Sequence, residues 1–457
     1  MAEPTIVFNF GTGSDTAASG APSSLAAKSG ANASTAAATA VVTLSVDAPD
    51  LSDVPTDGSA VMWVLSSSGR QFSKISAVDN VLKTVTCADN FSNTESGRTW
   101  GIGGKRATIG QTNSVKVFAS TDGKAGWTVS IEDDQSISVA VAVSVAGTQA
   151  QPFKIVGSSE SPRLVITQSA NTYTWQVTGT HIWFESLKFR NTNATKTSAW
   201  CVLANMTTYY FKNCIIGDTA NKFKYGFVRN TGTPTIFMED CYVTGCTDAG
   251  VYSDSGCYLR ATGCHFDNND THGIWAGGSS WYFTLTSCIF SDNGGDGINY
   301  LSTGQLVDFD IQDCTFDGNT GDGIDVATTT SIAGIIAGNQ FTNNGGYGVR
   351  VGTADRTGGL VIPDFNNYFG NTSGARLNFP TGANDQALDP QYTSAGTDDY
   401  SIGTNTKEKG YPKLNRNIGA GQSTTKSFKD IGASQRQESA GGSTYDKSLI
   451  LQPTGTY

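Results

Sequence analysis

The sequence predicts an all-β protein whose central part is a right-handed single-stranded parallel β-helix, with a β-rich module before it and a short polar tail after it. Two observations predict this fold. A unit of 23 to 27 residues repeats six or seven times, and the same residue types return in the same columns of each copy. Short stretches of the unit alternate apolar and polar residues, so each copy is expected to carry about three short strands.

Columns of like residues define the repeat. A glycine followed by an apolar residue recurs at Gly226, Gly250, Gly273, Gly297, Gly323 and Gly348. An asparagine lies four residues before most of these glycines, at Asn269, Asn293, Asn319 and Asn344. An aromatic residue lies three residues before each asparagine, at Phe266, Phe290, Phe316 and Phe341. A further column precedes the aromatic residues, at Cys214, Cys241, Cys264, Cys288 and Cys314, followed by Asn339 and Asn366.

A chain with this repeat can coil so that each copy pairs onto the previous one and like residues stack, for example Ile324 over Ile298. We expect the asparagines in turns, bonded to the backbone of neighbouring coils, and we expect the glycines to allow turn conformations. The cysteine column is expected to pack as small buried hydrophobes rather than as disulfides or a metal site. Free thiols fit assembly in a reducing cytoplasm.

The repeat also divides the chain. Residues 1–110 are expected to form a separate β-rich module, because runs such as Val61–Leu65 and Val81–Thr86 are typical of strands. Residues 111–390 are expected to form the β-helix, with clear coils over residues 181–378. Residues 391–457 are predicted to be a polar tail.

Composition excludes several classes of function. The formal net charge is −10, which disfavours binding to nucleic acid or to an acidic membrane surface. No apolar run is long enough to span a membrane, and the N-terminus lacks the pattern of a secretory signal peptide. No residue pattern indicates a cofactor or a metal site.

At this point the repeat resembles the pectate-lyase-like right-handed β-helix superfamily. Two shorter segments, residues 9–20 and 99–109, look like parts of β-helix proteins on the virions of tailed bacteriophages. That resemblance implies a homotrimer on the virion surface, assembled in the host cytoplasm. It would be a capsid decoration, head spike, tail spike or fibre, and the N-terminal module would attach it to other capsid or tail proteins.

Catalysis is the alternative on the same scaffold, as a tailspike depolymerase that cleaves host polysaccharide by lysis or hydrolysis. Superfamily members that cleave acidic glycans place carboxylates, often with Ca²⁺ and a nearby Arg or Lys, on the outer face of a sheet. Asp308 and Asp310 are the candidate catalytic residues, because they alternate with Phe309 and should face outward. Arg260 is the only Arg or Lys between residues 245 and 345, so a solvated acidic face, and a protein that is not an enzyme, is the favoured interpretation.

Aromatic residues suggest a binding surface instead. The residue after the inward Ile or Val should point outward and stack from coil to coil, at Tyr252, Trp275, Asn299, Asp325 and Arg350. Tyr252 beside Trp275 could form a platform on which a sugar stacks, or it could belong to a contact between subunits. His272 resembles the histidine-containing turn of polygalacturonases, but the other motifs of that family are missing. The sequence therefore favours a structural virion protein that binds host or environmental glycans.

Overall fold

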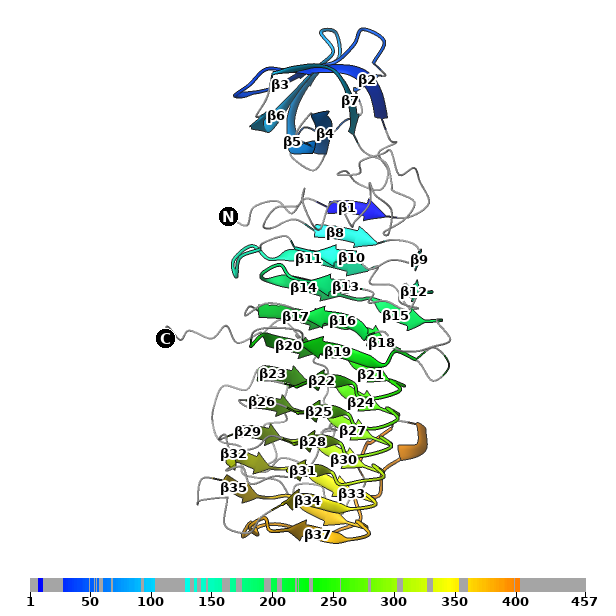
Figure 1. The fold of residues 1–457 in the computed structure, drawn as a ribbon, viewed down its shortest axis with the longest axis vertical. Helices are drawn as coiled ribbons and strands as arrows, with labels where there is room; N and C mark the ends of the chain where they lie inside the picture. The colour runs from blue at the N-terminus through cyan, green and yellow to red at the C-terminus, as the bar shows by residue number, and fades with distance from the viewer. Residues whose placement is uncertain are drawn as a thin grey trace, which may run out of the picture. The chain divides into compact units, whose positions relative to one another are not determined.

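The computed structural model describes residues 7–10, 28–102 and 128–402, with short gaps within the last two ranges. By its internal contacts the chain divides into two compact units, Met1–Trp281 and Tyr282–Tyr457, which are described separately. Both units are built of β-strands, and a single 3-10 turn, Ala395–Thr397, is described near the end (Figure 1). Among the described residues, no helix has the length and apolar character needed to cross a membrane.

A closed antiparallel barrel forms within the predicted N-terminal module. Its strand order is β2-β3-β6-β5-β4-β7, with bounds Lys28–Thr35, Thr39–Thr43, Thr84–Phe91, Gly69–Asp79, Val61–Ser66 and Glu95–Ile102. The barrel encloses a core in which Met62, Val85 and Trp100 are fully buried. The strand expected from Val81 begins only at Thr84, because the Asp79 carboxylate accepts hydrogen bonds from the next turn and stops the pairing.

The remaining described strands of the first unit form three parallel sheets. In sheet 1 the order is β1 (Val7–Phe10), β8 (Thr128–Ile131), β11 (Phe153–Gly157), β14 (Ile182–Glu185), β17 (Thr208–Lys212), β20 (Thr235–Glu239) and β23 (Cys257–Thr262). In sheet 2 it is β10 (Val141–Val143), β13 (Trp175–Val177), β16 (Ala199–Leu203), β19 (Tyr225–Arg229), β22 (Val251–Ser253) and β25 (Ile274–Ala276). In sheet 3 it is β9 (Gln135–Ile137), β12 (Val165–Gln168), β15 (Lys188–Asn191), β18 (Ile215–Ile216), β21 (Tyr242–Thr244) and β24 (His265–Asp267). Since β1 pairs with β8, residues 7–10 belong to the coils and not to the barrel.

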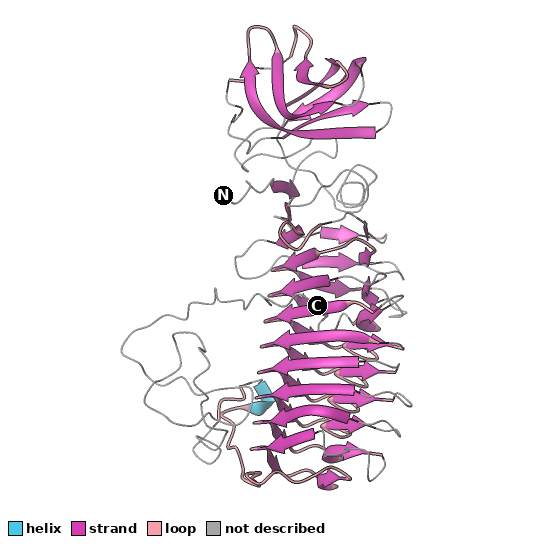
Figure 2. Cartoon of the chain, turned by 90° about the vertical axis from the view of Figure 1, so that its left-hand side faces the viewer, coloured by secondary structure: helices cyan, strands magenta, loops and turns pink. Residues whose placement is uncertain are grey.

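The second unit repeats the same three sheets. Sheet 1 contains β26 (Trp281–Thr286), β29 (Val307–Gln312), β32 (Ile332–Ala337) and β35 (Val361–Asp364). Sheet 2 contains β28 (Ile298–Tyr300), β31 (Ile324–Val326), β34 (Tyr347–Val351) and β37 (Gly374–Leu377). Sheet 3 contains β27 (Ile289–Ser291), β30 (Thr315–Asp317), β33 (Gln340–Thr342) and β36 (Asn367–Phe369). Figure 2 shows successive strands running in the same direction, as a parallel β-helix requires.

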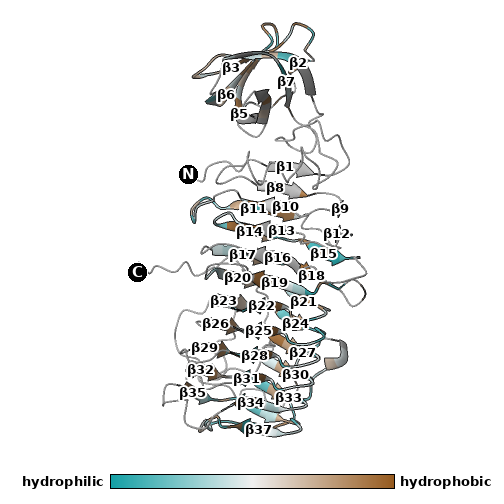
Figure 3. Cartoon of the chain, viewed as in Figure 1, coloured by the Kyte–Doolittle hydropathy of each residue, from teal (hydrophilic) through white to brown (hydrophobic). Residues whose placement is uncertain are grey.

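Like residues stack on like residues inside the coils. One column of rings in the second unit has centroids 4.8, 4.9 and 5.1 Å apart and planes within 12° of each other, at Phe290, Phe316, Phe341 and Tyr368. Ile298 pairs with Ile324, as the repeat predicts. Hydrophobic residues occupy strands such as β25 and β27, and the predicted parallel β-helix is confirmed (Figure 3).

Each coil turns between sheet 1 and sheet 3 at a single residue. That residue has a left-handed backbone conformation with φ between 50° and 70°, at Ser186, Asn213, Asp240, Gly263, Ser287, Asp313, Gly338 and Phe365. A left-handed residue bends the chain sharply and ends the alternation of the strand. This corner explains why the apolar alternation slips in phase just before the cysteine column.

The glycine column has a different reason from the one expected. Gly323 does not adopt a left-handed conformation. A Cβ atom on Gly323 would lie 2.5 Å from the carbonyl oxygen of Gly348 in the next coil, and one on Gly250 would lie 2.7 Å from that of Gly273. The glycines are therefore required by the close approach of neighbouring coils and not by turn conformation.

Asparagine side chains join one coil to the next, as expected. Asn319 Nδ2 donates to Asn344 Oδ1 at 2.9 Å, and Asn344 Nδ2 donates in turn to Asn371 Oδ1 at 2.8 Å. A second column links the Asn339 amide to Asn366 Oδ1 at 3.1 Å. The cysteines pack nearby as buried free thiols. Buried turns are thus satisfied by side chains and not by water.

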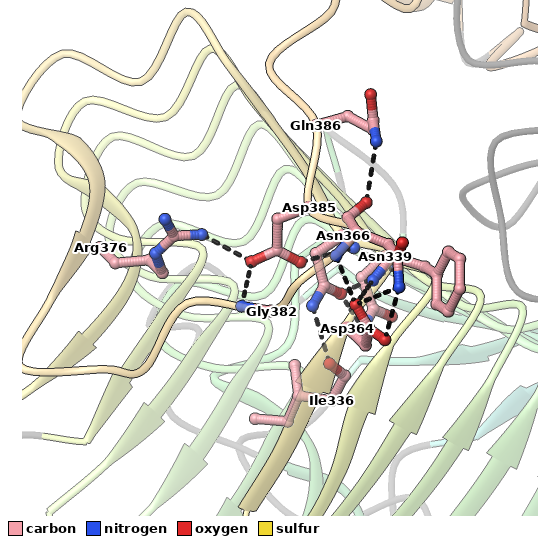
Figure 4. Close-up of polar contacts among 10 residues, drawn as sticks. Ile336, Asn339, Asp364, Asn366, Arg376, Gly382, Asp385 and Gln386 are labelled. Carbon is pink, nitrogen blue, oxygen red and sulfur yellow. Dashed lines mark hydrogen bonds and ion pairs between the residues drawn. The ribbon is translucent and has the colours of Figure 1, made fainter.

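A loop after the last strand closes the second asparagine column. The Asp385 Oδ1 accepts a hydrogen bond from the amide of Asn366 at 3.0 Å. Its Oδ2 accepts from the amide of Gly382 and from the guanidinium of Arg376, at 2.8 and 2.7 Å (Figure 4). The amide of Gln386 then donates to the Asn366 carbonyl at 2.7 Å. Asp385 takes the place that the asparagine of a further coil would hold. Residues beyond 402 of the predicted tail lie outside the described residues.

Replacing Asn344 tests the asparagine ladder. Asn344→Ala removes the acceptor for the Asn319 amide and the donor to the Phe316 carbonyl. Because each buried backbone group left without a partner costs about 1–3 kcal/mol, the free energy of unfolding should fall by about 2–4 kcal/mol. Urea denaturation followed by circular dichroism measures the change. The control is Thr320→Ala in the same turn, where the side chain is exposed. Equal losses in both variants would contradict the ladder's role.

Candidate functional site

An aromatic cluster lies on the outer face of sheet 2 in the first unit. Tyr252 and Trp275 occupy paired positions on β22 and β25, and their ring centroids lie 5.2 Å apart with a tilt of 64°. Tyr225 stacks on the other side of this pair, 4.7 Å from Tyr252 and within 18° of parallel. All three side chains are half-buried, whereas Val251 and Ile274 beside them point inward and are buried. We call Tyr225, Tyr252 and Trp275 the aromatic cluster.

Charged and polar groups surround the aromatic cluster. Lys224 Nζ lies 4.9 Å from the centre of the Tyr225 ring and 4.0 Å from the Asp248 carboxylate. Burial raises the pKa of Tyr225, and the hydrogen bond to Asp248 and the charge of that carboxylate raise it further. His272 lies 5.7 Å from the Trp275 ring. Aromatic rings with hydrogen-bonding groups beside them can bind a sugar, whose apolar face stacks on the ring while its hydroxyls are bonded at the edge.

The candidate catalytic pair is only partly described. Asp310 lies on β29 next to the buried Phe309, is half-buried, and accepts a hydrogen bond from Gln312 at 2.5 Å. Asp308 pairs through its backbone with Ala333, but its side chain lies outside the described residues. Catalysis by Asp308 and Asp310 stays a prediction.

The structure brings together three other carboxylates in the second unit. Asp296 and Asp322 lie in the turns before β28 and β31, and Asp325 lies on β31. Their carboxylate oxygens lie within 4.8 Å of one another, and all three side chains are buried. We call Asp296, Asp322 and Asp325 the acidic cluster.

Arginine and backbone groups partly neutralise the acidic cluster. Arg350, which pairs with Asp325 from the next strand, lies 3.4 Å from both the Asp322 and the Asp325 carboxylates. The Asp296 Oδ1 accepts from the Asp322 amide at 2.6 Å, and the Asp322 Oδ1 accepts from the amide of Tyr347. Three carboxylates therefore share one guanidinium, and the Arg350 side chain is 41% exposed.

The residues fit a divalent cation of the Ca²⁺ kind. Burial raises the pKa of Asp322, and the charge of Asp296 adds to that shift. Asn299 is 7% exposed, and its Nδ2 donates to Asp296 at 2.5 Å. Its Oδ1 accepts no hydrogen bond from the residues that the structure describes. Carboxylate and amide oxygens are the ligands that Ca²⁺ prefers, so Asp296, Asp322, Asp325 and Asn299 could hold one. A bound cation would neutralise the cluster and could attract the carboxylate of an acidic sugar.

Sequence reasoning missed the acidic cluster for a reason of register. Asp296 and Asp322 are 26 residues apart, and Asp325 and Arg350 are 25 residues apart, so each pair is separated by about one coil. The signal was present, because Asn299, Asp325 and Arg350 belong to the outward column. What was missing was the position of the turn residues Asp296 and Asp322 relative to that column.

Comparison with known proteins agrees with the fold. A family model described as "Right handed beta helix region" matches residues 176–335. The chain is similar to pectate lyase Pel9A, with 14% identity and a TM-score of 0.49 over 69% of this chain and 89% of that one. It is also similar to ORF18 of Geobacillus virus E2, with 15% identity and a TM-score of 0.37 over 58% and 55% of the chains. For the PL6 family polysaccharide lyase Pedsa3628 from Pseudopedobacter saltans the values are 12%, 0.34, 64% and 94%.

No curated protein sequence matches this chain. At such low identities the likeness to solved structures concerns the fold alone. The chain is a right-handed parallel β-helix protein, and the particular role of this β-helix has to be argued from its own outer face.

Calcium tests the acidic cluster. Since burial raises the pKa of Asp322, its stabilising contribution is present at low pH and is lost as the pH rises through the folded-state value. Millimolar Ca²⁺ near pH 7 should relieve that loss and raise the melting temperature by a few degrees, and the effect should shrink near pH 5 as protons compete. Scanning fluorimetry with Ca²⁺ or EDTA measures the shift. Asp325→Asn should abolish it, whereas Asp310→Asn should keep it. Equal shifts in the two variants would contradict the site.

Proposed function

We propose that this chain is a surface-exposed structural protein of a tailed-bacteriophage virion whose β-helix binds a glycan through the aromatic cluster. The observation that carries the glycan part is the position of Tyr225, Tyr252 and Trp275 on neighbouring strands of one outer face. The tilt of Trp275 takes its ring out of the parallel stack formed by Tyr225 and Tyr252. A sugar therefore has an aromatic surface that is not wholly covered by other rings.

The scaffold favours such a role. Backbone pairing on both sides fixes each strand of a coil, so outward side chains are presented with little conformational freedom. Preorganised rings bind with a smaller loss of entropy than rings on mobile loops. The virion part rests on the sequence resemblance of residues 9–20 and 99–109. In this proposal the protein is a homotrimer, and the N-terminal module attaches it to other virion proteins.

Glycan binding is measurable directly. A glycan array with the full-length protein should identify a ligand, and isothermal titration calorimetry should then show about tenfold or greater loss of affinity in Trp275→Ala, because aromatic contacts dominate such interfaces. Tyr252→Ala should behave in the same way. Tyr282→Ala is the matched control, since Tyr282 is 37% exposed on sheet 1. A ligand bound equally well by all three variants would place binding elsewhere.

A second function is favoured by one observation, the acidic cluster with Arg350. In this alternative the protein is a depolymerase that cleaves an acidic polysaccharide. The carboxylates would hold a cation that neutralises the substrate's carboxylate, and such neutralisation eases removal of the neighbouring proton in a lyase reaction. Arg350 is the most exposed charged group of this set, so it is the one that a polysaccharide can reach.

Activity assays separate the two functions. Purified protein is incubated with host capsule and with uronate polysaccharides, and unsaturated products and reducing ends are measured. For a lyase at the acidic cluster, wild type should release unsaturated product, and Arg350→Ala should lower the rate by about 100-fold or more. Loss in Asp308→Ala and Asp310→Ala, with Arg350→Ala still active, would instead favour the pair predicted from the sequence. Absence of product from every substrate would leave the binding role as the function.

A further inference from the structure

A second group of outward aromatic residues runs along sheet 1 of the first unit. Five neighbouring strands each contribute one residue at paired positions: Lys154, Trp183, Tyr210, Phe237 and Arg260. The residues on either side of each one point inward and are buried. We call these five residues the aromatic stripe.

The rings of the aromatic stripe stack face to face. The centroids of Trp183 and Tyr210 lie 5.2 Å apart with planes 22° apart, and those of Tyr210 and Phe237 lie 4.9 Å apart at 12°. A cation covers each end of the stack. Lys154 Nζ lies 5.0 Å from the Trp183 ring, and Arg260 Cζ lies 5.4 Å from the Phe237 ring.

This geometry disfavours a sugar as the partner. A pyranose binds an aromatic ring by lying on its face, but both faces of each ring in the stripe are already covered by a neighbouring ring or cation. What the stripe offers is a row of ring edges, half-buried and apolar. Such a surface fits the side chains of another protein, because aromatic residues and arginine are the types most enriched in the cores of protein interfaces.

Charge favours a second copy of this chain as that protein. The neighbouring outward column alternates in sign, at Glu185, Lys212 and Glu239, and Lys212 pairs with Glu239 at 3.0 Å. The stripe and this column together hold three cations and two anions, whereas the chain carries a net charge of −10. Repulsion between copies is therefore weakest on this face, and an alternating column can pair with another of its kind.

We propose that the aromatic stripe is the core of a self-association interface, in which sheet 1 of one copy packs against the same face of another. The stripe spans four coil steps, which is about 19 Å at a strand spacing of about 4.8 Å. That length suits the apolar core of an interface, and the alternating charges form its rim. The inference concerns a different face from the aromatic cluster and does not depend on the virion role.

Mass measurement tests the interface. Light scattering after size exclusion should give the full-length wild type a discrete oligomeric mass at micromolar concentration. Combining Trp183→Ser with Tyr210→Ser should shift the protein to monomer or weaken association at least tenfold. Lys212→Glu, which makes the neighbouring column wholly acidic, should also weaken it, and added salt should restore part of the loss.

Controls keep the outcome decisive. Tyr252→Ser, on the outer face of sheet 2, should leave the oligomeric mass unchanged, and circular dichroism checks that each variant is folded. Should the double variant fail to fold, Lys212→Glu still tests the face. A wild type that stays monomeric at all concentrations would overturn the proposal, as would stripe variants that keep the wild-type mass. Loss of binding to an anionic polysaccharide in the stripe variants, with their mass unchanged, would also overturn it and would assign this face to a glycan.

Discussion

The structure depends on one constraint, the parallel in-register pairing of each coil with the next. Because every residue lies on its equivalent one coil away, a side chain is accepted where a copy of itself can stack on it. Phenylalanine satisfies this by ring stacking, asparagine by donating and accepting at once, and glycine by leaving room for a carbonyl of the next coil. The repeat of the sequence is the record of that constraint.

This constraint is why the coils could be predicted and why other parts could not. Columns such as Phe290, Phe316 and Phe341 repeat at one spacing, so their stacking follows from the sequence. The barrel has no repeat, and strands such as β2 and β7 pair across more than fifty residues, so its closure was not predictable. The role of Gly323 was misjudged because a glycine in a sequence does not reveal whether conformation or space requires it. The corner at Asp313 was likewise hidden, since aspartate adopts many backbone conformations.

Candidate sites follow the same division. The proximity of Tyr252 and Trp275 was predictable, because both hold one position in the repeat. The acidic cluster combines turn residues, Asp296 and Asp322, with a strand residue, Asp325, and such mixtures require knowing how the turn folds back on the strand. Ring orientation was beyond reach as well. The tilt of Trp275 and the parallel stack of Tyr210 separate a surface suited to a sugar from one suited to protein, although both consist of outward aromatic residues.

The placement of Asp385 against the last coil bears on how long such a molecule can become. A parallel solenoid ends in sheet edges whose amides and carbonyls match those of any other coil, and exposed edges of this kind recruit further strands. By substituting a carboxylate, itself engaged by Arg376, for the next asparagine, the chain makes its terminal coil unlike the others. Length is then set within each molecule, and end-to-end polymerisation into fibrils finds no matching template there.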